Sequence, residues 1–203
     1  MSDTSFLVGE NFLDDPHAIR RWALSREVRT EDYHGEKWPG IISDWGMYPT
    51  QKLSEFMGFD VQPVLSFFRL NTPENSPDSR IHADDVVLGS EWASVIYLCT
   101  PEQERDMNCG TAIWRHLPTH AEGRPPIDFA KYTGEDLGEF YARIDDDGHD
   151  ESKWQLMGHS AMKNNRIVVY PSQLFHSRYP RNTVFGDTKE TGRLVWVNFF
   201  KRA

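Results

Sequence analysis

Short segments rich in β-branched and aromatic residues are the feature that most restricts the fold of this chain. They lie beyond residue 60, are separated by turn-forming residues, and cover residues 64–70, 81–88, 92–98, 111–114, 166–170, 174–179 and 193–200. Several short segments of this composition are typical of the strands of an antiparallel sandwich or barrel. The pattern therefore predicts a mainly β (α+β) fold.

The N-terminal part of the chain has a different pattern. Asp15 and Pro16 are typical of the first turn of a helix. A second, short helix is predicted over residues 51–57, with Gly58 at its end. We therefore expect residues 1–60 to form an N-terminal helical support for the strands.

One long segment interrupts the series of predicted strands. Residues 117–163 are acidic, and their apolar residues recur at roughly helical intervals between Gly134 and Asp145. The sequence predicts a partly helical insertion here, which is either a lid over a binding site or a solvated surface loop. A length of 203 residues fits a single domain, residues 1–203, that includes this insertion.

Charge and cysteine content exclude several classes of protein. The chain has 22 basic and 31 acidic residues and a net charge of −9, which argues against binding to nucleic acid or to an anionic membrane surface. It lacks an apolar run long enough to span a bilayer. Its 2 cysteines do not form a disulfide framework, so we expect a cytoplasmic protein. The oligomeric state is left open.

Three residues could form a metal site. In the triplet His82-Ala83-Asp84, positions i and i+2 of an extended chain point to the same side, so both side chains could reach one ion. A His-x-Asp triplet alone is weak support, because one is expected by chance among 8 histidines. His176, in a predicted strand that follows a tight turn, is the best third ligand. Two histidines and one carboxylate form the facial triad of non-haem Fe(II) oxygenases.

A charged residue at the start of the last predicted strand also needs an explanation. Arg193 shares its side of the strand with Val195 and Val197. Its guanidinium either lies at the solvent-exposed rim or is buried with an anionic partner, and arginine suits a carboxylate because it can donate two parallel hydrogen bonds. Arg178, which is close to His176 in sequence, is an alternative anion-binding residue.

The order of these motifs along the chain resembles the Fe(II)/2-oxoglutarate-dependent dioxygenase superfamily, in particular its prolyl-hydroxylase-like branch. The motifs are His82-Ala83-Asp84, the strand ending in Tyr97-Leu98, Gly110-Thr111-Ala112-Ile113-Trp114, the segment from Tyr170 to His176, and Gly192-Arg193-Leu194-Val195-Trp196-Val197. The resemblance covers residues 64–200. The strand before the His-x-Asp triplet differs from the family pattern, because the chain has Phe67, Phe68, Arg69 and Leu70 where a tyrosine often faces the cosubstrate.

The resemblance implies a double-stranded β-helix, or jelly roll, with residues 61–116 and 164–200 as its core. It further implies that His82, Asp84 and His176 are catalytic ligands of Fe(II). Arg193 would bind the far carboxylate of the cosubstrate 2-oxoglutarate, with a hydrogen bond from Tyr97.

The activity implied is that of a hydroxylase-type oxygenase acting on a small molecule or a peptide of unknown identity. A cupin-like metal-binding protein without oxygenase turnover, acting as a sensor or a small-molecule binder, is the alternative. Consumption of 2-oxoglutarate distinguishes the two.

Overall fold

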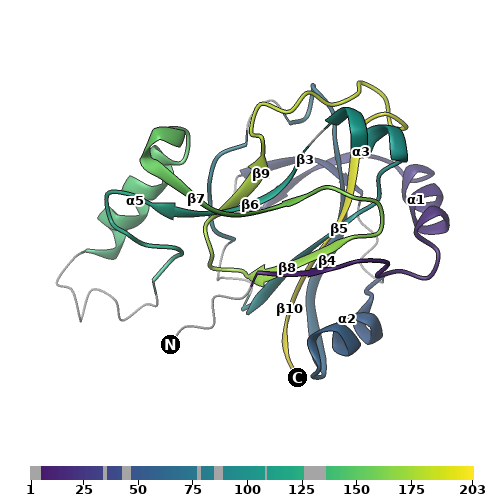
Figure 1. The fold of residues 1–203 in the computed structure, drawn as a ribbon, viewed down its shortest axis with the longest axis horizontal. Coiled ribbons are helices and arrows are strands. Elements are labelled where there is room, and N and C mark those ends of the chain that lie inside the picture. Colours follow the sequence, from purple (N-terminus) through teal and green to yellow (C-terminus); the bar gives the residue numbers. More distant parts are fainter. Residues whose placement is uncertain are drawn as a thin grey trace.

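The computed structural model describes residues 6–33, 36–42, 47–76, 79–84, 89–107, 109–125 and 136–203. Its elements, in chain order, are β1 (Leu7–Gly9), α1 (Pro16–Leu24), β2 (Arg29–Tyr33), β3 (Glu36–Ile42), α2 (Thr50–Met57), β4 (Val61–Asn71), β5 (Trp92–Tyr97), α3 (Pro101–Met107), β6 (Gly110–His116), α5 (Leu137–Asp147), the 3-10 helix η2 (Glu151–Lys153), β7 (Trp154–Ala161), β8 (Ile167–Pro171), β9 (His176–Tyr179) and β10 (Arg193–Arg202). Figure 1 shows α5 at one end of the molecule and α1 at the other. Among the described residues, no helix is both long and apolar enough to cross a membrane.

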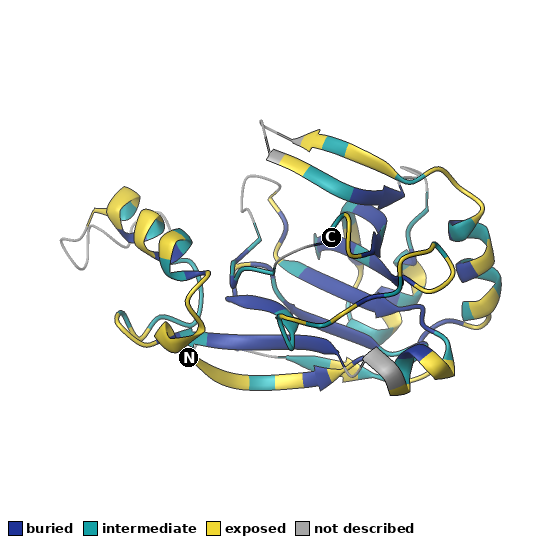
Figure 2. Ribbon diagram, turned by 90° about the horizontal axis from the view of Figure 1, so that it is seen from above, coloured by how far each residue is buried: buried dark blue, intermediate teal, exposed yellow. Residues whose placement is uncertain are grey.

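Two antiparallel sheets dominate the fold, which confirms the mainly β class. The larger sheet has seven strands in the order β1-β8-β5-β10-β4-β3-β2, and the smaller has three in the order β7-β6-β9. The long strand β10 pairs with β4 on one side and with β5 on the other, so it lies at the centre of the larger sheet. The central strands are buried, whereas the helices expose one side (Figure 2).

Alternation along the central strands divides their side chains between two cores. Phe68 and Trp196 face one side of the larger sheet, where α1 and α2 cover them. Phe67 and Val195 face the other side and pack toward the smaller sheet. Because both faces are covered, these strands are apolar on both sides.

The two N-terminal helices form as predicted. The side chain of Asp15 accepts a hydrogen bond from the backbone N–H of Ala18 at 2.8 Å, which caps α1. Gly58 ends α2 in the left-handed conformation, with φ of 73°.

Residues 1–60 are not only a helical support, however, because they also contribute the strands β1, β2 and β3. β1 pairs with β8, and β3 pairs with β4. These strands lie in the outer part of the larger sheet and form against partners distant in sequence, which a local pattern does not reveal.

Two other regions differ from the sequence expectation. Residues 117–163 contain the expected helix, α5, but also β7, which pairs with β6 as the outer strand of the smaller sheet. Of the strand expected over residues 81–88, only His82 forms an isolated bridge, and residues 85–88 lie outside the described part of the chain.

Candidate metal centre

Backbone hydrogen bonds bring His82 and Asp84 to His176, although more than 90 residues separate His176 from the other two in sequence. His82 and His176 form an isolated antiparallel bridge, in which each backbone N–H donates to the other's carbonyl, at 3.0 and 2.7 Å. The backbone N–H of Asp84 donates to the carbonyl of Ser172 at 3.0 Å. This pairing holds the His-x-Asp segment against the start of β9.

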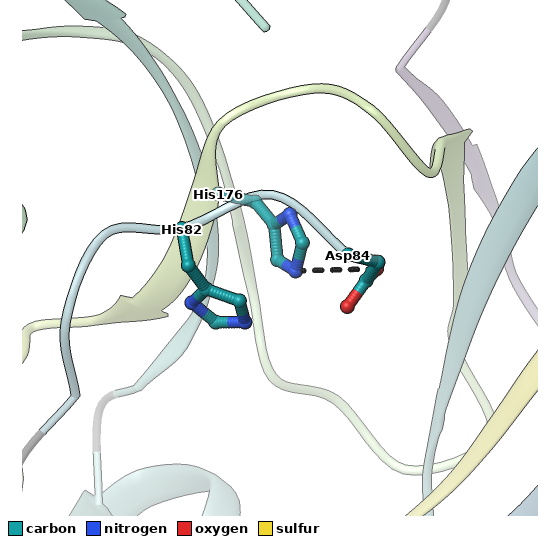
Figure 3. Close-up of side chains that lie close together, drawn as sticks. All are labelled: His82, Asp84 and His176. Carbon is teal, nitrogen blue, oxygen red and sulfur yellow. Dashed lines mark ion pairs between the residues drawn. The ribbon is translucent and has the colours of Figure 1, made fainter. Parts of the chain in front are cut away.

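The three side chains converge on one point (Figure 3). One ligand atom of each lies within 4.8 Å of those of the other two. His176 Nε2 is 3.5 Å from Asp84 Oδ2, and the centroids of the two imidazole rings are 4.5 Å apart. The expected meeting of His82, Asp84 and His176 is therefore present in the structure.

Hydrogen bonds to carbonyl groups orient both imidazoles. His82 Nδ1 lies 3.0 Å from the carbonyl oxygen of Arg80, and His176 Nδ1 lies 2.8 Å from that of Leu174. Because a carbonyl oxygen can only accept, each Nδ1 carries a proton, which leaves Nε2 of each ring as the atom that can bind a metal ion. Histidine ligands of metals are commonly oriented by such a hydrogen bond from the other ring nitrogen.

The carboxylate of the cluster also fits a metal ligand. Asp84 Oδ2 is buried and accepts no hydrogen bond from the described residues. Burial raises the pKa of Asp84, while His176, Arg124 and Arg69 act in the opposite direction. Burial and the proximity of His176 lower the pKa of His82 to about 3. Two neutral imidazoles and one carboxylate suit a divalent ion such as Fe(II).

The cluster faces a cavity of about 750 Å³. Its lining includes two carboxylates, those of Asp84 and Asp145. It also includes six cationic side chains, which are Lys37, Arg69, Arg80, Arg124, Arg178 and Arg193. Asp145 and His149 come from the segment 117–163, so this segment flanks the cavity. A cavity next to the cluster with this excess of positive charge is suited to an anionic ligand.

Arg193 is the most deeply buried of these six cations, with 6% of its surface exposed. It donates from Nη1 to Asn71 Oδ1 at 2.8 Å, and its guanidinium lies 5.6 Å from the ring centroid of Tyr97. Arg178, the alternative anion-binding residue, donates to the carbonyl of Arg181 at 2.6 Å and lies over the ring of Phe185. Both arginines line the cavity.

Tyr97 is fully buried beneath Arg193. Its hydroxyl lies 2.6 Å from Thr111 Oγ1. Thr111 is among the residues that line the cavity, whereas Tyr97 is not. The structure therefore brings Tyr97 next to Arg193, with Thr111 between its hydroxyl and the cavity.

Two further residues of the cavity were not singled out as site residues from the sequence. Tyr170 lies beside the cluster, with its ring centroid 4.6 Å from that of His176. Arg69 lies on β4 between Phe67 and Asn71, and all three line the cavity. The signal for Arg69 was a charged residue within an otherwise apolar strand segment.

Comparison with solved structures defines the class of fold. The α-ketoglutarate-dependent epimerase SnoN from nogalamycin biosynthesis is 13% identical, with a TM-score of 0.57, over 98% of this chain and 77% of that chain. The α-ketoglutarate-dependent carbocyclase SnoK from the same biosynthesis is 11% identical, with a TM-score of 0.60, over 99% and 81%. HygX from Streptomyces hygroscopicus, solved with nickel and 2-oxoglutarate bound, is 12% identical, with a TM-score of 0.51, over 98% and 84%. The chain has the fold of these proteins, as the sequence resemblance implied; α-ketoglutarate and 2-oxoglutarate are the same compound.

The family itself is defined by sequence. Residues 1–200 match the model of DUF6445, a family of unknown function, and the chain belongs to this family. The search of curated proteins finds no match.

Proposed function

We propose that this protein is an Fe(II)- and 2-oxoglutarate-dependent oxygenase of the hydroxylase type, and that its two sheets form the jelly roll, or double-stranded β-helix, of such enzymes. In this proposal His82, Asp84 and His176 are the catalytic metal ligands. The observation that carries it is the His–Asp–His cluster at a cavity that also contains the buried Arg193. A metal site and an anion-binding residue within one cavity are what a metal-chelating dicarboxylate needs.

Three protein ligands leave open positions on an octahedral metal ion. With Fe(II) and 2-oxoglutarate bound, the centre would use O2 to oxidise a substrate C–H bond while 2-oxoglutarate is converted to succinate and CO2. The protein would supply the position of the reactants and the exclusion of water. Its two imidazoles are already fixed by the carbonyl groups of Arg80 and Leu174.

Arg193 would bind the far carboxylate of 2-oxoglutarate. Its buried Nε has no hydrogen-bond partner in the described part of the chain, and Asn71 holds the guanidinium through Nη1. Tyr97 would help to position Arg193, because its ring contacts the guanidinium and its hydroxyl is held by the hydrogen bond with Thr111. Arg193 is favoured over Arg178 because Arg193 is buried, whereas Arg178 is only partly buried.

The substrate of this proposal is a small molecule or a peptide that enters the cavity, and no nucleic-acid or membrane partner is proposed. Residues 117–163 would act as a lid, since Asp145 and His149 already lie at the cavity. The free cysteines Cys99 and Cys109 support a cytoplasmic location. The similar proteins include an epimerase and a carbocyclase, whereas the product proposed for this protein is a hydroxylated substrate.

The decisive experiment needs no substrate. The protein is loaded with Fe(II) under anaerobic conditions and exposed to O2 and 2-oxoglutarate, and succinate is quantified by chromatography. We expect slow, uncoupled formation of succinate that stops in His176→Ala. His159→Ala is a matched control, because His159 lies on β7 and is not part of the cluster. Metal binding without binding or consumption of 2-oxoglutarate would instead support the cupin-like sensor or small-molecule binder.

A further inference from the structure

Arg69 is a charged side chain that has no hydrogen-bonded counterpart among the described residues. Its Nε is buried, and its guanidinium makes no hydrogen bond or ion pair with any residue that the structure describes. An unpaired guanidinium removed from water is unfavourable unless an anion binds to it. The side chain lines the cavity, so an anion can reach it there.

The strand register places Arg69 next to Arg193. Val195 of β10 pairs with Arg69 of β4, and Arg193 pairs with Asn71. Arg69 and Arg193 are therefore diagonal neighbours on adjacent strands, with Cα atoms about 7 Å apart, and both face the cavity. Two guanidinium groups that face the same cavity repel each other, and an anion bound between them would relieve the repulsion.

Arg69 also lines the same cavity as the three residues of the cluster. Burial lowers the pKa of Arg69, and the charge of Arg193 lowers it further, while the carboxylate of Asp84 raises it. The charge of Arg69 in turn lowers the pKa of Asp84 and of His82. Arg69 thus interacts with Arg193 on one side and with the cluster on the other.

From this position we infer that Arg69 binds the carboxylate group of 2-oxoglutarate that adjoins the oxo group, next to the metal, so that an arginine holds each end of the cosubstrate. The inference rests on the proposed function and goes beyond it, because it assigns a second anion-binding residue. Asp84 is the one carboxylate that contributes to the pKa of Arg69, and in the metal-loaded protein it is a ligand of the ion. A second anion is then needed for Arg69, and the metal-chelating carboxylate is the one nearest to the cluster.

The test compares two ligands that differ at one end. 2-Oxopentanoate keeps the oxo-acid end of 2-oxoglutarate and has a methyl group in place of the far carboxylate. The dissociation constants of both are measured by calorimetry with the Ni(II)-loaded protein, which avoids turnover. We expect Arg69→Leu to weaken both ligands by a similar factor, about 10- to 100-fold. Arg193→Leu is expected to weaken 2-oxoglutarate by such a factor and to leave 2-oxopentanoate within about threefold.

Two variants make this comparison secure. Arg21→Leu removes one positive charge from an exposed residue of α1 that does not line the cavity, and it is expected to change neither affinity by more than about twofold, since solvent screens an exposed charge. Arg69→Lys keeps the charge but loses the planar fork, so an intermediate affinity for both ligands is expected. It also serves as the test if Arg69→Leu does not fold, and Ni(II) affinity is measured separately in each variant.

The outcomes separate the two proposals. If the wild-type protein binds 2-oxoglutarate and Arg69→Leu binds both ligands unchanged, the inference is wrong, and Arg69 is left for an anionic group of the substrate. If Arg69→Leu weakens 2-oxoglutarate but not 2-oxopentanoate, Arg69 acts on the far carboxylate and the inference is also wrong. If the wild-type protein binds Ni(II) but neither ligand, the proposed function itself fails.

Discussion

The carboxylate of Asp84 destabilises the folded protein when no cation is bound to it. Its Oδ2 is buried without a hydrogen-bond donor among the described residues, and its pKa is raised by burial. A raised pKa means that the ionised form, which dominates in the unfolded chain above about pH 4, is disfavoured in the folded protein. The carboxylate therefore opposes folding of the metal-free protein near neutral pH, and a bound cation would reverse this effect.

The first prediction follows from the destabilising effect of the Asp84 carboxylate on the metal-free protein. Asp84→Asn is expected to leave the metal-free protein as stable as the wild type, or more stable by up to about 2 kcal/mol, because a neutral amide is cheaper to bury than a carboxylate. The same change is expected to abolish most of the rise in melting temperature that Mn(II) or Fe(II) produces. Thermal unfolding with EDTA and with added metal measures both effects. An undiminished metal effect in Asp84→Asn would exclude the carboxylate as a ligand.

The second prediction concerns Cys99, whose side chain is fully buried. Burial and the nearby carboxylate of Glu104 raise the pKa of its thiol to about 12. Only the thiolate reacts with disulfide reagents, so at pH 8 the reactive fraction is about a thousandfold smaller than for an ordinary cysteine. We expect Cys99 to remain unmodified in the native Cys109→Ala variant and to react promptly once urea unfolds it. Prompt reaction in the native state would show that the thiol is accessible and ionised.

At the scale of elements, α5 supports the metal centre from the segment 117–163. Phe140 and Ile144 are its buried residues and belong to a small core with Ile81 and Ala83, the residues on either side of His82. The backbone N–H of Ile81 also donates to the carbonyl of Gly148, just after the helix, at 2.9 Å. The helix thus helps to hold the extended His-x-Asp segment, which has little regular structure of its own.

The third prediction tests this support. Phe140→Ala removes a buried aromatic ring and is expected to lower the free energy of unfolding by about 3–5 kcal/mol. Metal affinity should fall as well, because Ile81 and Ala83 lose part of their packing. Glu139→Ala, an exposed change on the same helix, is the control and is expected to stay within about 0.5 kcal/mol. Urea unfolding and Ni(II) titration of the folded variants measure the two effects, and loss of stability with unchanged metal affinity would contradict the coupling.

The same elements show how far the sequence could be interpreted. Strands β4, β5, β8 and β10 could be predicted because β-branched and aromatic residues dominate them, as burial on both faces requires. β7 could not, since it is an outer strand that exposes Leu156 and Met157 and has no clear alternation. Its formation depends on pairing with β6.

The site was predictable to a similar degree. His82 and Asp84 are two residues apart, so a local rule places them together, and only the partner strand of His176 had to be inferred. Arg69 and Tyr170 belong to the cavity through strand register and sheet packing, which bring β4 and β8 to the same side. No local pattern reports which face of a strand lines a cavity when both faces are buried.

For the whole molecule, the distribution of charge differs from its sum. The chain has a net charge of −9, yet the cavity has six cationic and two acidic side chains among its described lining residues. Distant surface charges are screened by salt, whereas charges inside a cavity with low-dielectric walls act strongly on a ligand. The two distributions predict opposite effects of salt on the binding of a dianion.

The fourth prediction follows from the opposite signs of the net charge of the chain and the charge of the cavity. If the overall charge governed binding, added salt would screen a repulsion and tighten 2-oxoglutarate binding. Because the cationic cavity governs it, we expect raising NaCl from about 0.05 to 0.5 M to weaken the affinity of the Ni(II)-loaded protein several-fold. The dependence on salt should be smaller in Arg193→Leu, which lacks one of the attracting charges. Isothermal titration at four salt concentrations measures both slopes, and affinity that rises with salt would mean that the arginines of the cavity are neutralised by groups of the protein before the ligand arrives.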